Sequence, residues 1–166
     1  GEYDEIRNIA AHINEVVVEN KVARYCENLI VNTILLKMTE QAQSFHIDLR
    51  MDVRVPREIP VNEYEFALVL ANLLENAINS VKDLGEAGKY VTAKVHCTAE
   101  YLLIDMENEC GKEISFNTVT GLPESGSGRN HGLGLQSVKA FSEKLGGNID
   151  CYCEKNRFRI ILFVNF

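Results

Sequence analysis

The sequence predicts an α/β fold of the α+β type: a two-layer sandwich in which helices cover one face of a mixed, mostly antiparallel sheet. Three observations support this prediction. Apolar residues recur at helical spacing through most of the first half of the chain. Segments with strand character follow one another directly in the second half. The 166 residues, of which 46% are hydrophobic, are enough to bury the core of one compact domain.

Two helices and a strand are expected before residue 56. The first helix covers residues 2–20, and the second begins after Asn28, whose side-chain oxygen is suited to capping a helix N-terminus. Apolar and polar residues then alternate through residues 47–55, which predicts a half-buried strand. Pro56 marks the loop that follows.

The third helix is expected to begin after Asn62 and to run to about Asp83. Glu65 follows Asn62 by three residues, so the pair resembles a capping box at the start of this helix. Two strands, Tyr90–Thr98 and Tyr101–Glu107, come next and are joined by a short turn.

The last third of the chain predicts a loop, a helix and a hairpin. Residues 108–128 show no clear period, and loops of that length in a compact domain are usually functional or mobile. A helix is expected from about Gly132 to Leu145, ended by Gly146 and Gly147. The final hairpin joins strands over 148–154 and 157–166.

Charge and cysteine content limit the function. The net charge of −7 argues against a nucleic-acid partner, although a local phosphate site needs only a few amides and cations. The five cysteines form no CxxC pair and no Cys/His metal spacing, which favours reduced thiols and a cytoplasmic location. No apolar run is long enough to span a membrane, so we expect no membrane contact by this chain.

A row of polar residues interrupts the otherwise apolar third helix. Asn72, Glu75, Asn76 and Asn79 are spaced at i, i+3, i+4 and i+7, which places them on one side of the helix. Amide oxygens are uncharged hard ligands, able to coordinate Mg²⁺ beside phosphates without adding repulsion. Two alternatives are a solvated helix face and a buried amide network that satisfies its own hydrogen bonds.

A glycine-rich segment leads into the last helix. Residues 126–135 read GSGRNHGLGL, and a helix N-terminus with flexible backbone amides binds anions. Arg129 and His131 would add charge or donors. A flexible loop or a simple helix cap is the alternative. The P-loop is excluded because no Gly-Lys-Ser/Thr occurs, and the glycine spacing does not fit the dinucleotide fingerprint.

Two of these segments resemble the motifs of a known family. Residues 72–80 (NLLENAINS) resemble the N box of the GHKL ATPases, which include the histidine kinases and gyrase, and residues 131–139 (HGLGLQSVK) resemble their second glycine box. The resemblance covers roughly Ile47 to the C-terminus. Residues 24–35 resemble the segment that precedes this domain in GHKL-type sensor histidine kinases of Gram-positive bacteria. The resemblance implies a Bergerat ATPase fold that binds ATP under a lid formed by 108–128.

The resemblance also implies roles for individual residues. Asn76 would bind Mg²⁺, and Asn72 and Glu75 would be catalytic at the phosphates. Asn108 stands where the family's first glycine box has an aspartate that accepts a hydrogen bond from adenine, and Phe158 stands where many members carry threonine. The residues implied to bind ATP are Asn72, Asn76, Asn79, Asn108, Gly111, Arg129, His131, Gly132, Leu133, Gly134 and Leu135.

The resemblance implies the ATP-binding catalytic domain of a two-component sensor histidine kinase. Residues 46–166 would form this domain, and residues 1–45 would be the tail of a region linking it to the phosphoacceptor helix. The γ-phosphoryl would pass to a histidine on a helix absent from this chain, and then to a response regulator. His12 lacks the His-Asp or His-Glu pair typical of such a helix, so the chain alone is expected to be inactive in autophosphorylation.

The intact kinase is expected to be a homodimer anchored in the bacterial plasma membrane, with this domain in the cytoplasm. The alternative is a nucleotide-binding interaction module without autokinase activity, either similar to an anti-sigma factor or a degenerate kinase. A third possibility is a structural domain whose asparagines merely pack, which would bind no nucleotide.

Overall fold

The computed structural model describes residues 24–111, 114–124 and 131–166, with the backbone alone at 131–133. The predicted helix over residues 2–20 and the predicted ligand Arg129 lie outside the described residues.

The core of the architecture is a five-stranded sheet with the strand order β1-β2-β3-β5-β4. Its strands are β1 (Asp48–Arg54), β2 (Tyr90–Cys97), β3 (Tyr101–Glu109), β4 (Asn148–Glu154) and β5 (Arg157–Asn165). β1 pairs with β2 in parallel, and the other three pairings are antiparallel. The prediction of a mixed, mostly antiparallel sheet is therefore confirmed.

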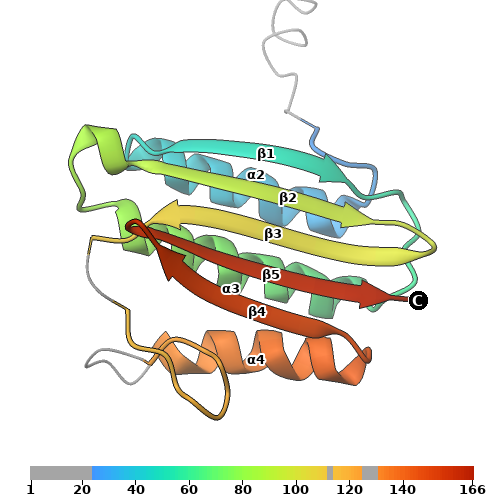
Figure 1. Ribbon diagram of the computed structural model, residues 1–166. Helices are drawn as coiled ribbons and strands as arrows, with labels where there is room; N and C mark the ends of the chain where they lie inside the picture. Colours follow the sequence, from blue (N-terminus) through green and yellow to red (C-terminus); the bar gives the residue numbers. More distant parts are fainter. Residues whose placement is uncertain (1–23, 112–113, 125–130) are drawn as a thin grey trace, which may run out of the picture.

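Three helices cover one face of this sheet (Figure 1). They are α2 (Leu29–Ser44), α3 (Glu63–Val81) and α4 (His131–Lys144), and a short 3₁₀ helix, η1 (Glu86–Gly88), precedes β2. The other face of the sheet carries no helix in the described parts of the chain (Figure 1). The molecule is thus the two-layer sandwich that the sequence predicts.

The hydrophobic core fills the space between the helices and the sheet. Alternate residues of β3 face it, so that Leu102, Ile104 and Met106 are buried. The fully buried side chains of the helices include Phe66, Leu70, Leu74 and Ile78 of α3 and Val31 and Leu35 of α2. α2 therefore packs into the same core as α3, and the predicted domain boundary after residue 45 stays a prediction.

Local signals predicted the element ends well, with two corrections. The Asn28 side chain caps α2 by accepting from Val31 N–H at 3.0 Å. Asn62 caps α3 by accepting from the amides of residues 64 and 65, but the capping box is wrong in its second half. The Glu65 carboxylate instead accepts from Lys144 Nζ of α4 at 2.8 Å. α3 ends at Val81, two residues before the predicted end.

The second correction concerns the long loop predicted over 108–128. β3 continues to Glu109, because it pairs with β5 as far as Glu109 and Arg157. Residues 108 and 109 therefore belong to the sheet and not to the loop. The final hairpin turns at Lys155 and Asn156, which both have positive φ, as a two-residue hairpin turn requires.

Candidate functional site

The polar row of α3 lies on the side of the helix that turns away from the core. Asn72, Asn76 and Asn79 are half-buried, and Glu75 is exposed. The opposite side of the same helical turns buries Leu73, Leu74, Ala77 and Ile78. This division sets the side of α3 on which the asparagine side chains lie. The buried residues hold α3 against the sheet, so the polar row lies at the edge of the core.

The N-terminal turn of α4 packs against this row. A Cβ placed on Gly134 would lie 3.7 Å from Asn76 Nδ2 and 3.8 Å from Asn72 Cβ and Cγ. The amide row and the glycine-rich segment are far apart in the sequence, and the fold brings them into contact. The first backbone N–H groups of a helix have no partner within the helix and carry its positive partial charge. Amide side chains and backbone donors thus meet at one place.

Two contacts hold α3 and α4 in this arrangement. The rings of Phe66 and Phe141 stack with centroids 6.5 Å apart. One turn further along α4, Lys144 is paired with Glu65. Leu135, whose backbone amide was predicted to contact phosphate, packs its side chain against the core. The side chains of the predicted ligands His131 and Leu133 lie outside the described residues.

Asn108 lies on the helix-facing side of β3, next to the core. It is 3% exposed and stands directly opposite Phe158 of β5. Its Nδ2 donates to the Glu109 carbonyl at 2.9 Å, a bond that uses an amide hydrogen and not the Oδ1 acceptor. Gly111 lies three residues further along the chain. A Cβ placed on Gly111 would lie 2.6 Å from Leu84 Cδ2, so the backbone passes close to the segment that follows α3.

Residues 114–124 of the predicted lid form a compact turn with its own hydrogen bonds. Asn117 Oδ1 accepts from the amides of Val119 and Thr120, and the Asn117 N–H donates to the Leu122 carbonyl. The ring of Phe116 stacks on Phe158 at 6.5 Å, beside Asn108. Sequence reasoning missed this aromatic contact, although an aromatic residue in a polar loop was an available signal.

A second contact joins this turn to α4. Lys139 Nζ donates to the Thr120 carbonyl at 3.3 Å. The segment between β3 and α4 is therefore attached at both ends of the candidate site, to Phe158 on the sheet and to Lys139 on the helix.

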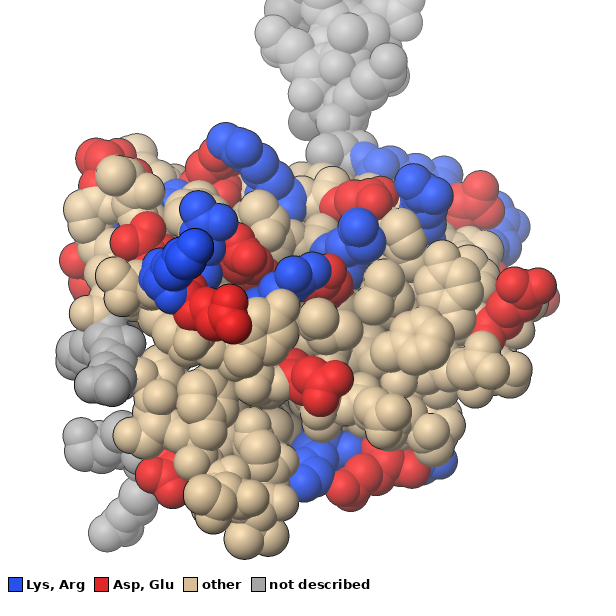
Figure 2. All heavy atoms as spheres, in the orientation of Figure 1, with Lys and Arg blue, Asp and Glu red and all other residues tan. Residues whose placement is uncertain are grey.

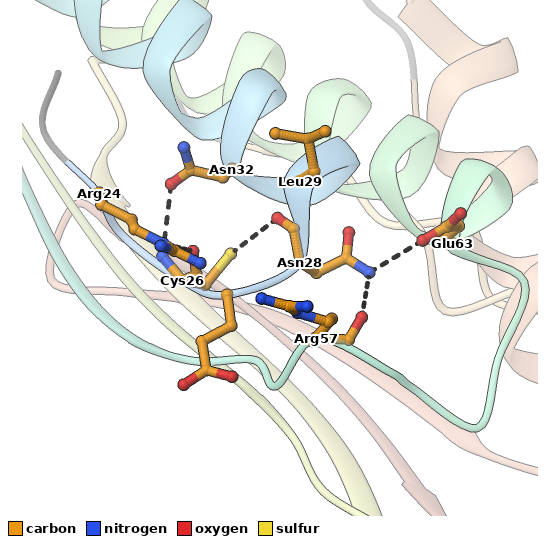
Figure 3. Close-up of a pocket in the computed structure, with 8 residues that line it drawn as sticks. Arg24, Cys26, Asn28, Leu29, Asn32, Arg57 and Glu63 are labelled. Atoms are coloured by element: carbon orange, nitrogen blue, oxygen red, sulfur yellow. Dashed lines mark hydrogen bonds between the residues drawn. The ribbon is translucent and has the colours of Figure 1, made fainter.

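Two hollows of the described residues lie away from this site. One, of about 590 Å³, lies where α2 and α3 begin and is shown in Figure 3. Asn28 at its base is 1% exposed, and its Nδ2 donates to the Arg57 carbonyl and to Glu63 Oε2. Its amide hydrogens are thus already used to join the two helix starts.

The other hollow, of about 480 Å³, lies on the helix-free face of the sheet. Charged side chains gather there over β1 and β2 (Figure 2). Ion pairs also join β3 and β5 on this face: Arg159 donates two hydrogen bonds of 2.7 Å to the Asp105 carboxylate, and Arg157 lies 3.7 Å from Glu107. Neither hollow contains a residue predicted to bind ATP.

Comparison with known families identifies the class of protein that this fold and site define. The family model of the GHKL domain matches residues 61–164, well over half of the chain, and the chain belongs to that family. The matched residues include the amide row, Asn108, the glycine-rich segment and all strands but β1. Membership of this ATP-binding family implies that the chain binds a nucleotide.

Solved structures of histidine kinase catalytic domains share the fold. The catalytic domain of histidine kinase ThkA superposes with a TM-score of 0.63 at 16% identity, over 82% of this chain and 91% of that one. The mycobacterial sensor histidine kinase MprB gives 0.58 at 16%, over 82% and 93%. Full-length ShkA in complex with AMPPNP gives 0.59 at 16%, over 81% of this chain and 29% of that one. None of the curated proteins matches the chain significantly in sequence.

The described residues limit the site in one further way, and their helices show one more feature. No cluster of three or more His, Cys, Asp or Glu side chains is arranged to hold a metal ion there. A metal in the described part would therefore depend on other ligands, such as amides and the oxygens of a bound molecule. None of the described helices is long and apolar enough to cross a membrane.

Proposed function

We propose that this chain is the ATP-binding catalytic domain of a two-component sensor histidine kinase. It would bind Mg·ATP and present the γ-phosphoryl group to a histidine on the phosphoacceptor helix of the intact kinase. A response regulator would then receive the group. The enzyme would thus be an ATP-dependent protein-histidine kinase.

One observation carries this proposal: the contact of Gly134 with Asn72 and Asn76. It puts the positive end of α4 beside neutral amide side chains, an environment that attracts phosphates without opposing charge. The structural neighbour ShkA was crystallised with AMPPNP, an ATP analogue, which favours the same ligand class here.

The donor set suits magnesium. Asn76 would be its protein ligand, because an amide oxygen is a hard ligand and Mg²⁺ usually takes few protein ligands beside phosphates and water. When bound, the ion would neutralise charge on the phosphates. Asn72 and Glu75 would be the catalytic residues beside the phosphates, and Asn79 would contact the phosphates one turn further along α3. Backbone amides of Gly132, Leu133, Gly134 and Leu135, with Arg129 and His131, would complete the phosphate cradle.

The base would lie at the other end of the site. Asn108 would accept a hydrogen bond from the adenine amine through Oδ1, and Gly111 would let the chain pass close by. Burial of Asn108 supports this role, since a hydrogen bond in a water-poor place discriminates strongly between bases that can and cannot make it. The neutral amide gives a weaker bond than an aspartate would.

The proposal is tested by calorimetric titration of the protein with ATP in the presence of Mg²⁺. Asn76→Ala is expected to raise the dissociation constant by about tenfold or more, as the loss of a group that fixes a metal does. Asn165→Ala is the matched control, because Asn165 is an exposed asparagine at the end of β5. Unchanged affinity in Asn76→Ala would refute its role as metal ligand, and absence of binding by the wild type would refute the proposal.

The intact kinase would act as a homodimer in which this domain meets the phosphoacceptor helix, and it would be anchored in the bacterial plasma membrane. Residues 1–45 would belong to the connection between the two parts. Adding a phosphoacceptor region of a related kinase and measuring transfer from labelled ATP would separate this function from a nucleotide-binding module without kinase activity.

A further inference from the structure

Two cysteines from distant parts of the chain meet at the base end of the candidate site. Cys110 follows the last residue of β3, and Cys153 lies in β4. Their Sγ atoms are 2.8 Å apart, and both thiols are free. A disulfide bond is about 2.05 Å long, so the two sulfurs are within about an ångström of bonding distance.

The backbone holds this pair in place on both sides. Cys110 N–H donates to the Asn156 carbonyl in the β4–β5 turn at 2.8 Å, which fixes the end of β3 against the tip of the hairpin. Cys153 is in the β4–β5 ladder opposite Phe158. The approach of the sulfurs is therefore set by strand pairing and not by a chance rotation of loose side chains.

We propose that Cys110 and Cys153 are a redox modification site, which forms a reversible intramolecular disulfide by exchange with low-molecular-weight disulfides. Cytosolic disulfides, where they occur, are usually transient and sense redox state. A two-thiol zinc site is a poorer explanation, because the described residues offer no cluster of three or more metal-ligating side chains.

Exposure assigns the order of the two steps. Cys153 is half-buried and Cys110 is 6% exposed, so the reagent reaches Cys153 first. The Cys153 thiolate attacks one sulfur of the reagent, forms a mixed disulfide and releases the other half as a thiolate. Cys110 then attacks the Cys153 sulfur and releases the second half. Two protein thiols and one reagent disulfide thus yield one protein disulfide and two reagent thiols.

The second step has a predictable pH dependence. Burial raises the pKa of the Cys110 thiol above its ordinary value. Because the thiolate is the attacking species, closure of the bond should accelerate as the pH rises through the alkaline range.

The experiment exposes the whole chain to oxidised glutathione and counts thiols by alkylation in denaturant. The reduced wild type carries five cysteines, and oxidation should leave 5 − 2 = 3 that react. The protein mass should fall by about 2 Da with no retained glutathione, and dithiothreitol should restore all five. The unfolding midpoint should rise on oxidation, since the bond closes a long loop in the unfolded chain.

Variants decide which cysteines react. After exposure to oxidised glutathione, neither Cys110→Ser nor Cys153→Ser should lose two reactive thiols. Cys153→Ser should also form no mixed disulfide with glutathione. Cys151→Ser is the matched control, because Cys151 lies two residues from Cys153 on the same face of β4 and should be dispensable. Loss of the disulfide in Cys151→Ser, or its persistence in Cys110→Ser, would overturn the assignment, as would five reactive thiols in oxidised wild type.

A consequence for nucleotide binding rests on the proposed function. Cys110 is two residues from Asn108, and Cys153 stands opposite Phe158. Bound Mg·ATP should therefore slow the loss of the two thiols. Equal rates with and without nucleotide, in protein that calorimetry shows to bind it, would overturn the placement of the pair at the base end. Failure of calorimetric binding would instead count against the proposed function, while the thiol count would still decide the disulfide.

Discussion

Gly147 occupies a position where the backbone leaves no room for a side chain. A Cβ there would lie 2.6 Å from the Phe163 carbonyl oxygen and 2.6 Å from Val164 Cγ2. The first of these atoms belongs to the backbone of β5, which cannot turn aside as the end of a side chain can. Gly147 also accounts for how α4 ends, because its N–H donates to the Ser142 carbonyl at 2.9 Å.

Gly147→Ala is therefore expected to lower the free energy of unfolding by about 1–3 kcal/mol, as overpacking against a fixed backbone does. Urea denaturation measures the change. Gly85→Ala is the control, since a Cβ on Gly85 would meet nothing within 4 Å and its φ is −64°. That variant should stay within about 0.5 kcal/mol of wild type. Similar losses in the two variants would contradict the argument.

Single residues differ in how far the sequence predicts them. The row of Asn72, Asn76 and Asn79 followed from spacing alone, because the helical period fixes which positions share a side. The partner of Glu65 did not follow. Its carboxylate was expected to turn back to Asn62, but it binds Lys144, 79 residues along the chain. Local rules cannot foresee a partner that only tertiary packing supplies.

At the scale of elements, α4 combines two demands that favour different residues. Gly134 lies inside the helix, where alanine has the higher helix propensity by up to about 1 kcal/mol. The Cβ of an alanine would also fit sterically, at 3.7–3.8 Å from the amides of α3. Neither helix propensity nor a steric clash therefore explains the glycine. What the absence of a side chain preserves is free space between α4 and α3.

Gly134→Ala is expected to leave stability unchanged or to raise it by at most about 1 kcal/mol, while weakening ATP binding. The added methyl group would take up space between Asn72, Asn76 and the helix start, where the proposed function puts phosphates. Calorimetry and urea denaturation together measure the two effects. Gln136→Ala, an exposed change on the same helix, should alter neither. Unchanged ATP affinity in Gly134→Ala would remove the helix start from the phosphate site.

Helices and strands were predicted within about two residues wherever period and caps agreed, because those signals are local. The region after β3 was predicted less well. Pairing with β5 extends β3 to Glu109, and the turn at 114–124 is held by the Asn117 side chain and the stack of Phe116 on Phe158. Neither the extension of β3 nor this turn corresponds to a periodic pattern in the sequence. The meeting of polar side chains on α3 with the glycine-rich start of α4 was thus partly foreseeable from the sequence, whereas the surroundings of Asn108 were not, and the ligand roles of these residues stay predictions.

At the scale of the whole molecule, the two faces of the sheet have different chemistry. The face under the helices is apolar and ends in Asn108 and Cys110, whereas the opposite face carries the paired charges of β1 to β3 and β5 (Figure 2). Global stability therefore depends on one buried layer. Groups that titrate within that layer should make the unfolding of the entire domain depend on pH.

Cys97 is such a group. It is 0% exposed at the end of β2, and burial raises the pKa of its thiol from 9.0 to about 11. In the unfolded chain the thiol ionises near 9.0, whereas in the folded protein it stays protonated. Between these values the folded state binds more protons than the unfolded state. Stability is therefore complete below pH 9 and decreases as the pH rises toward 11.

The urea midpoint of the reduced protein is expected to fall between pH 8 and pH 10.5, and to fall less in Cys97→Ala. The comparison uses the difference between the two pH values within each protein, so the loss of packing caused by the substitution cancels. Tyrosines and lysines titrate alike in both proteins and cancel as well. Equal decreases in wild type and variant would show that the Cys97 proton does not contribute, and that the alkaline loss of stability arises from other groups of the domain.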